Sequence, residues 1–281
     1  KNLICESGAG QHYSATAAVA AKFGIPLIGV MGEVDIKRVN QNIIKAKHYG
    51  AKLKAVPGTL KEAITDAIKT WITNPDYYYV CGSAVSSFPF PKIVQFAQSI
   101  IGREIREQCL EQEKKLPNMI IGCVGGGSNF IGSIHEFLDE PNIKKIGVEA
   151  AETAALTHGT PNIMQGMKSY MLASSDGSKS LGGSSLGAGI QYFGVGPQHS
   201  YLKDQGAVTY TSATDKEILN AYKVVAQTEG ISSALEPMAA AAEVLKQAKG
   251  KPKDFIIVLS LCGRGEKDLD TIEEHMGKDF E

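Results

Sequence analysis

The stretch that decides the fold is Cys123 to Gly132, CVGGGSNFIG. It continues an apolar run, Met119–Val124, that predicts a buried strand, and it leads into a predicted helix. Glycines let backbone N–H groups approach an anion without a Cβ in the way, and a helix adds the positive end of its dipole. The order of strand, glycines and helix therefore predicts a cradle for one phosphate group. Its residues are Gly125, Gly126, Gly127, Ser128 and Asn129.

The nucleotide-binding fingerprints do not fit this stretch. A Gly-x-Gly-x-x-Gly pattern that starts at Gly125 meets Phe130 where the third glycine should be, and no Gly-Lys-Ser/Thr occurs in the chain. A glycine-rich turn between strand and helix that binds no ligand stays open as the alternative reading.

Composition limits the class of protein. The chain has 281 residues, of which 43% are apolar, enough for one large or two ordinary domains. A net charge of −1 without a basic stripe argues against nucleic acid, and the apolar runs are too short for a membrane span. Five cysteines without a C-x-x-C motif predict free thiols in a reducing compartment, and hence a cytoplasmic protein. The six histidines form no zinc-binding pattern, so no metal is expected.

Strand-like and helical patterns alternate along most of the chain, which predicts parallel βαβ units and an α/β fold. The predicted strands are 3–5, 26–31, 52–56, 77–80, 119–124, 145–149 and 255–261. The predicted helices are 14–23, 34–48, 59–71, 93–113, 130–138, 215–229 and 237–249. A domain boundary is expected near Ser87–Pro91, where FPFP interrupts the pattern. Residues 153–204 show almost no regular pattern, which is typical of a functional segment.

The glycine loop also resembles the phosphate-binding loop of the tryptophan synthase β family, whose members use pyridoxal 5′-phosphate (PLP). Five more blocks resemble that family, in its order. They are CESGAGQH (5–12), LKEA (60–63), GVGPQHSYL (194–202), EGISSALEP (229–237) and CGRGEKDLDT (262–271). The resemblance extends from Leu3 to about Ile272.

The resemblance implies two three-layer α/β/α domains of the type II PLP fold. Residues 1–90 would be the remainder of the N-terminal, or communication, domain, and residues 91–281 the C-terminal domain that binds the PLP phosphate. The implied activity is that of a lyase in tryptophan biosynthesis: L-serine and indole give L-tryptophan and water. A homodimer is also implied, and an α-type subunit could bind through Arg38 and Lys61, which alone would read as solvated helix charges.

A second glycine loop, ESGAGQH, lies between a predicted strand and an alanine-rich helix. The backbone N–H groups of its first residues, the Gln11 side chain and the helix N-terminus predict an anion site, into which a carboxylate fits. The loop residues concerned are Ser7, Gly8, Ala9, Gly10, Gln11 and His12. By resemblance, this loop holds the α-carboxylate of the substrate, and Glu6 is the acid–base group. Otherwise Glu6 is a charge near a helix start and His12 an ordinary polar contact.

Further site residues follow from the resemblance. Cys262 would face the pyridine nitrogen of PLP, where the family usually has serine, unless it is a buried core cysteine. Glu229 would lie beside the cofactor ring, unless it is a charge at the end of its helix. Arg264 would bind substrate together with the residue at position 191, where the family has an aspartate and this chain has Gln191.

Two departures from the family leave an alternative function open. The family's Schiff-base lysine lies in a His-Lys pair before the ESGAGQH loop. This sequence has no such pair and starts without methionine, so we expect a segment before Lys1 to carry that lysine and the N-terminal domain to be incomplete. Gln191 cannot form the ion pair with Arg264. The chain could therefore be a paralogue with another amino-acid substrate, or a non-catalytic subunit that binds a partner.

A hydrolase is the remaining rival. Residues 183–187, GSSLG, satisfy G-x-S-x-G. A nucleophile elbow requires a strand before this motif and a helix after it, and the sequence predicts neither.

Overall fold

The computed structural model describes residues 1–37, 39–174 and 181–280. It divides the chain into two compact units, Lys1–Gly82 with Glu266–Asp270 and Ser83–Gly265 with Thr271–Glu281. The division comes earlier than the predicted boundary at residue 90. The earlier boundary follows from packing at the glycine loop. A Cβ added at Gly126 would collide with Ser83 and Val85, so the segment after Gly82 already packs against that loop.

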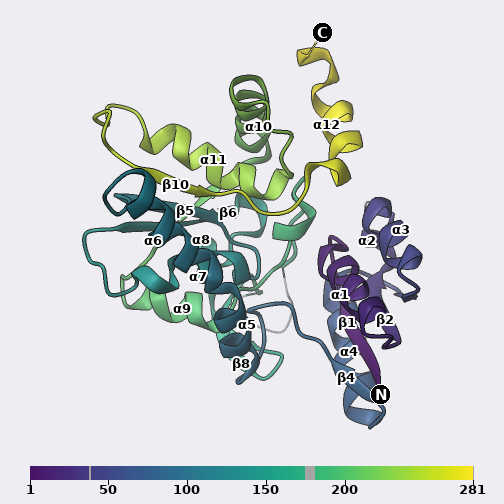
Figure 1. Ribbon diagram of the computed structural model, residues 1–281. Helices are drawn as coiled ribbons and strands as arrows, with labels where there is room; N and C mark the ends of the chain where they lie inside the picture. The colour runs from purple at the N-terminus through teal and green to yellow at the C-terminus, as the bar shows by residue number, and fades with distance from the viewer. Residues whose placement is uncertain (38, 175–180, 281) are drawn as a thin grey trace. The chain divides into compact units, whose positions relative to one another are not determined.

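The first unit is a four-stranded parallel sheet covered on both faces (Figure 1). Its strand order is β3-β2-β1-β4, with β1 at Asn2–Glu6, β2 at Leu27–Gly32, β3 at Lys52–Val56 and β4 at Tyr77–Tyr79. The helices are α1 (Gln11–Lys22), α2 (Glu33–Ile36), α3 (Asn40–His48) and α4 (Leu60–Thr73). Right-handed crossovers place α1 and α3 on one face and α4 on the other, because the chain reverses its direction across the sheet after β3.

The second unit repeats this plan with the strand order β10-β5-β6-β9, all parallel. The strands are β5 (Met119–Cys123), β6 (Lys144–Ala150), β9 (Thr209–Ala213) and β10 (Ile257–Ser260). The helices are α5 (Phe90–Gln98), α6 (Ile100–Gln112), α7 (Ser128–Ile134), α9 (Pro197–Asp204), α10 (Asp215–Glu229) and α11 (Leu235–Gln247). The α/β fold with parallel sheets is thus as the sequence predicts.

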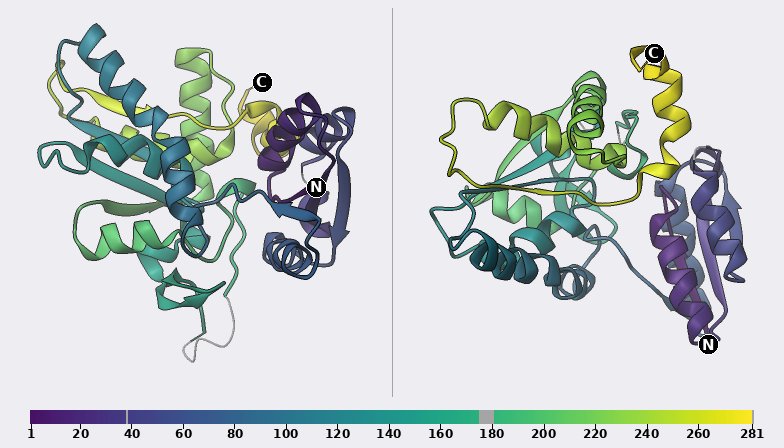
Figure 2. Two further views of the ribbon diagram at one scale, coloured as in Figure 1. Left: turned by 60° about the horizontal axis from the view of Figure 1, so that its bottom comes forward. Right: turned by 45° about the horizontal axis from the view of Figure 1, so that its top comes forward.

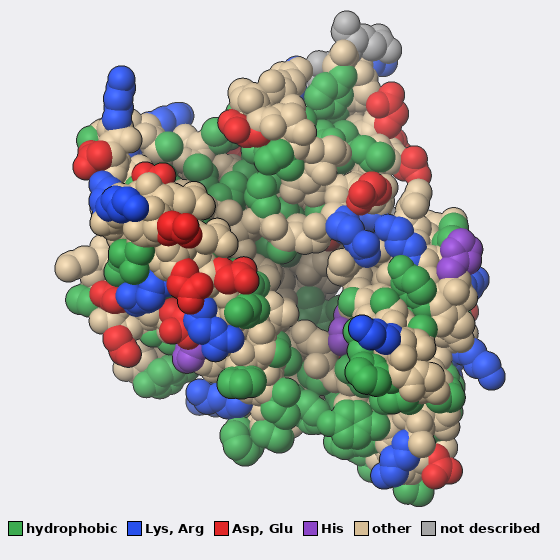
Figure 3. Space-filling model, viewed as in Figure 1, with side chains coloured by type: hydrophobic (Ala, Val, Ile, Leu, Met, Phe, Trp, Pro, Cys, Tyr) green, Lys and Arg blue, Asp and Glu red, His purple; other side chains and the backbone are tan. Residues whose placement is uncertain are grey.

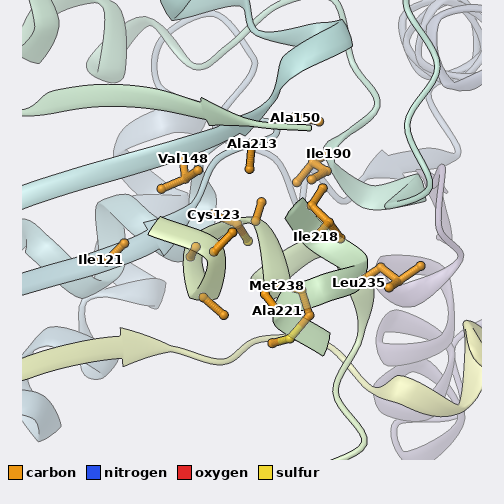
Figure 4. Packing of buried hydrophobic residues seen from close by; sticks show 14 of the residues in the cluster. Ile121, Cys123, Val148, Ala150, Ile190, Ala213, Ile218, Ala221, Leu235 and Met238 are labelled. Carbon is orange, nitrogen blue, oxygen red and sulfur yellow. The ribbon is translucent and has the colours of Figure 1, made fainter. Parts of the chain in front are cut away.

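The two faces of the second sheet bury separate apolar clusters. Met119, Ile121 and Cys123 of β5 pack with α10 and α11 (Figure 4), whereas Ile120 and Val124 pack with residues of α7 and α9. Side chains of a strand alternate between the faces, so a strand covered on both faces must be apolar at every position. This explains why β5 appears in the sequence as an uninterrupted apolar run.

Two helices that the sequence predicts as continuous are broken. The predicted helix 34–48 is interrupted at Val39, which has a non-helical backbone and a buried side chain. The predicted helix 93–113 is interrupted at Ser99, whose hydroxyl donates a hydrogen bond to the carbonyl of Phe96. Serine competes with helical hydrogen bonds in this way.

The segment 153–204 contains short elements that its composition conceals. They are the 3₁₀ turns η2 (Ala151–Thr153) and η3 (Ala188–Ile190), helix α8 (Ala155–His158), and the antiparallel strands β7 (Thr160–Met164) and β8 (Met167–Met171). Gln165 and Gly166 join β7 to β8, both at positive φ, as a two-residue hairpin turn requires. Helix α9 packs against β8 (Figure 2).

The remaining elements are η1 (His135–Phe137), η4 (Gly265–Lys267), α12 (Leu269–Met276) and η5 (Gly277–Asp279). Among the described residues, no helix combines the length and the apolar character that crossing a membrane requires. On the face drawn in Figure 3, Lys and Arg side chains are interspersed with Asp and Glu, in keeping with 29 basic and 30 acidic residues in the chain.

Candidate active site

The glycine loop occupies the turn from β5 to α7. Gly127 precedes the helix at φ 94°, a conformation that only glycine adopts without strain. The carbonyl of Gly126 accepts a hydrogen bond from the amide of Gly196, at 3.1 Å. The carbonyl of Gly127 accepts from the amide of Ile131, at 3.0 Å, and lies 2.7 Å from Nε2 of His199. The carbonyls of Gly126 and Gly127 are therefore engaged by other parts of the protein.

The loop fits a phosphate group. The first amides of α7 have no partner within the helix, as at every helix start, and they carry the positive end of the dipole. The Asn129 side chain contributes Nδ2 as a donor at the loop, where it lies 3.4 Å from the carbonyl of Cys123. Added Cβ atoms at the loop glycines would collide with Gly189, with Ser83 and with the ring of His199. Only glycine therefore allows this loop conformation.

His199 is a fully buried histidine that supports the loop. Its Nδ1 lies 2.8 Å from the hydroxyl of Tyr210, and its ring is stacked on Phe130. A carbonyl can only accept, so Nε2 carries the proton that is donated to Gly127, and Nδ1 accepts from Tyr210. Burial lowers the pKa of His199 to about 4, so the ring is neutral at physiological pH.

The neutral His199 should make stability pH-dependent. Below about pH 6.5 the unfolded chain binds a proton that the folded chain does not accept until about pH 4, so the free energy of unfolding falls as pH drops through this window. Burial raises the pKa of Glu149 to about 7, so the folded chain binds a proton there before the unfolded chain does. Glu149 therefore increases the free energy of unfolding as pH drops, opposite to His199. Wild type and the variant His199→Gln both contain Glu149, so the difference between their free energies of unfolding leaves the contribution of His199.

We expect the stability advantage of wild type over His199→Gln to shrink by about 2 kcal/mol between about pH 7 and about pH 5. Urea unfolding of both proteins at the two pH values measures this change. An advantage that does not depend on pH would show that His199 titrates normally.

The ESGAGQH loop joins β1 to α1 in the first unit. Gly10 precedes α1 at φ 74°, and the Asn42 side chain of α3 donates to the carbonyl of Ala9, at 2.7 Å. One part of the predicted anion site needs correction. The Ser7 amide donates to the carbonyl of Val30, at 3.1 Å, so it is not free to bind an anion. Among the residues of this anion site, the Ser7 amide is thus excluded as a donor.

Glu6 is buried at the end of β1, and its Oε2 has no partner among the described residues. Burial raises the pKa of Glu6, an effect that His12 and a hydrogen bond from Tyr79 partly offset. His12 is itself fixed, with Nε2 2.8 Å from the carbonyl of Val80. A carboxyl group with a raised pKa can both donate and accept a proton near neutral pH, which is what acid–base catalysis requires.

Two cysteines meet beside the glycine loop. Cys123 at the end of β5 and Cys262 after β10 have their sulfur atoms 3.5 Å apart. The contact with Cys262 and burial hold the pKa of Cys123 well above its usual value, so that thiol is uncharged. Cys262 is half-buried against the cluster that packs on α11.

Glu229 is not brought to this loop. It is the last residue of α10, and its side chain is exposed. A different residue, Glu236 in the first turn of α11, is buried and accepts a hydrogen bond from the amide of Gly189, at 2.7 Å. The negative charge of Glu236 also helps to raise the pKa of Cys123. We therefore place Glu236, rather than Glu229, beside the loop. An acidic residue in the first turn of a helix is favourable against the dipole, which was the available signal in the sequence.

The remaining predicted residues differ in burial. Gln191 is half-buried, and its Nε2 donates to the carbonyl of Gly183, at 3.4 Å. Arg264 is exposed after β10, and Lys61 is exposed in the first turn of α4. Arg38 lies outside the described residues.

Two parallel α/β units with a glycine-rich strand-to-helix turn are typical of enzymes that bind a phosphorylated cofactor through backbone amides. A family model for pyridoxal-phosphate dependent enzymes matches residues 1–263, so the chain belongs to that family. It is 45% identical, over 98% of its length and 70% of the relative's, to the tryptophan synthase beta chain of Allorhizobium ampelinum (strain ATCC BAA-846 / DSM 112012 / S4).

A solved structure shares the fold. It is the crystal structure of a mutant of O-ureido-L-serine synthase with O-ureido-L-serine bound. It gives a TM-score of 0.69 at 18% identity, over 97% of this chain and 75% of that one. The fold predicted from the sequence, with its family and its cofactor PLP, is thereby confirmed.

Proposed function

We propose that the protein catalyses a PLP-dependent β-replacement in which L-serine and indole give L-tryptophan and water. The observation that carries the proposal is the 45% identity to a tryptophan synthase beta chain over nearly the whole chain. It is supported by the buried Glu6, whose raised pKa suits the acid–base work that the reaction needs.

The chain's own groups divide the work as follows. The glycine loop from Gly125 to Asn129 holds the cofactor phosphate on its amides, and the Gly8–Gln11 part of the ESGAGQH loop holds the α-carboxylate of serine. Glu6 protonates the leaving β-hydroxyl and then receives the proton that indole gives up.

Bound PLP supplies an electron sink for the bonds at the α-carbon of the amino acid. Cys262, proposed to face the pyridine nitrogen, offers a weak, uncharged donor there, which leaves that nitrogen largely unprotonated. Buried Cys123 beside it carries no charge either.

Gln191 favours a second candidate, a β-replacement with a different amino-acid substrate. A neutral amide cannot form an ion pair with Arg264, and hydrogen bonds to charged groups are worth about 1.5–3 kcal/mol. The amide of Gln191 is also engaged with the carbonyl of Gly183.

We expect Gln191→Asp to increase the preference for serine over β-substituted alanines whose leaving group carries no hydroxyl. The reason is the restored charge-assisted pairing with Arg264. The ratio of kcat/KM for the two substrate types, in wild type and variant, measures it. A ratio that stays constant or moves the other way would show that position 191 does not sense the substrate.

The function itself is tested by nucleophile competition. The purified full-length protein, with PLP and serine, receives indole and sulfide at equal concentration, and the amino-acid products are separated by chromatography. Tryptophan as the main product supports the proposal. Cysteine as the main product, or serine consumed without either product, contradicts it.

Assembly and location are further parts of the proposal. We propose a cytoplasmic homodimer that can bind an α-type subunit through the first unit, with Lys61 and Arg38 at the contact. The first unit would then serve as the communication domain and the second as the domain that binds the PLP phosphate.

A further inference from the structure

The segment Gly194–His199, GVGPQH, lies behind the glycine loop and has no role in the reaction described above. It contributes two hydrogen bonds to adjacent loop carbonyls. The amide of Gly196 donates to Gly126, at 3.1 Å, and Nε2 of His199 donates to Gly127, at 2.7 Å.

These two bonds determine where the next amides point. In a trans peptide the C=O and the following N–H point in opposite directions. A Gly126 carbonyl held by Gly196 therefore directs the Gly127 amide away from the segment. A Gly127 carbonyl held by His199 directs the Ser128 amide to the same side.

Three consecutive glycines would not keep this arrangement unaided, because glycine has the greatest backbone freedom of any residue. The Gly127 carbonyl also accepts from Ile131, but hydrogen bonds at a carbonyl tolerate a broad range of directions. A second donor, on a rigid ring, restricts the rotation of that peptide plane.

The His199 ring is itself held in one orientation. Tyr210 of β9 donates to Nδ1, Phe130 of α7 stacks on one face, and the side chain is fully buried. Tyr210 is the titratable group that contacts the ring directly. The charge of Glu149 on β6 contributes to the raised pKa of Tyr210. Burial raises the pKa of that phenol well above its usual value, so the hydroxyl stays protonated and continues to donate.

We propose that His199 is a positioning residue for the cofactor phosphate: through the Gly127 carbonyl it aims the Ser128 amide at the phosphate and keeps it aimed before the cofactor binds. This rests on the proposed assignment of the glycine loop to the phosphate. Preorganised donors bind more tightly because less freedom is lost on binding.

The test uses pyridoxine 5′-phosphate and pyridoxine, which lack the aldehyde that reacts with lysines. Equilibrium dialysis gives the affinity of the full-length protein for each ligand. We expect His199→Phe, which keeps a flat ring without a donor, to weaken binding of the phosphate ester by about tenfold or more, the factor for about 1.4 kcal/mol. The affinity for pyridoxine should change by less than about twofold.

Two variants complete the set. His199→Gln keeps a donor for Gly127 and an acceptor for Tyr210, and it should restore most of the affinity. Phe137→Leu, a buried change in the apolar cluster that contains Phe130, controls for general loosening and should affect both ligands alike. Equal losses of both ligands in His199→Phe, or no loss, would overturn the proposal.

A measurement on the wild-type protein covers the case in which His199→Phe does not fold. In the ¹⁵N–¹H spectrum, the phosphate ester should shift the Gly127 and Ser128 amide signals, and pyridoxine should not. Amides that do not respond to the ester would also overturn the proposal. No substrate is present in either experiment, so a failure here is distinct from a failure of the proposed reaction.

Discussion

Gly127→Ala should lower the affinity for pyridoxine 5′-phosphate by roughly a hundredfold, which corresponds to about 2.7 kcal/mol. Two effects combine at this position. The backbone has φ 94°, which an alanine adopts only with strain, and the new methyl group would overlap the ring of His199. The loop must therefore leave the conformation that presents its amides. Equilibrium dialysis with the phosphate ester measures the loss.

Gly250→Ala is the matched control. Gly250 also has positive φ, 70°, but an added Cβ there meets nothing within 4 Å. This variant carries the backbone strain without the collision and should retain wild-type affinity. If Gly127→Ala binds the ester as well as Gly250→Ala does, the glycine loop is not the phosphate site.

Glu6→Gln should lower kcat for tryptophan formation by about 10²- to 10⁴-fold, the usual contribution of a general acid–base group. Glutamine preserves the size of the side chain and can still accept a hydrogen bond from Tyr79. It removes the carboxyl proton that the leaving hydroxyl requires. Initial rates from serine and indole at saturating concentrations measure the effect.

Cofactor binding separates this loss from damage to the fold. Affinity for pyridoxine 5′-phosphate should be unchanged in Glu6→Gln, because its phosphate site is assigned to the second unit. The control Glu33→Gln changes an exposed glutamate of the same unit and should leave the rate unchanged. A Glu6→Gln protein with a normal rate would exclude Glu6 as the acid–base group.

The strand, glycine loop and helix start from Met119 to Ile134 could be predicted from the sequence because their order depends on local rules; the binding of a phosphate there stays a prediction. An apolar strand, three glycines and a helix start are contiguous from Met119 to Ile134, and each follows from short-range rules. The same holds for the ESGAGQH loop. Strand β5 was also predictable, since burial on both faces makes a strand apolar throughout.

The supports of these loops could not be predicted in the same way, since they depend on tertiary contacts. Asn42 contacts Ala9 across 33 positions, and His199 contacts Gly127 across 72. β9 escaped prediction because its sequence, TYTSA, is polar and only its last residue is buried. Glu229 and Glu236 lie in one sequence block that resembles the family, and in the folded chain Glu229 is exposed whereas Glu236 is buried.

The most direct test of the proposed reaction follows the carbon atoms of serine. The purified full-length protein is incubated with PLP, indole and L-serine labelled with ¹³C at all carbon positions, and the products are identified by mass spectrometry. We expect tryptophan in which the α-carbon, the β-carbon and the carboxyl carbon all carry the label. Labelled pyruvate without labelled tryptophan, or serine recovered unchanged, would contradict it.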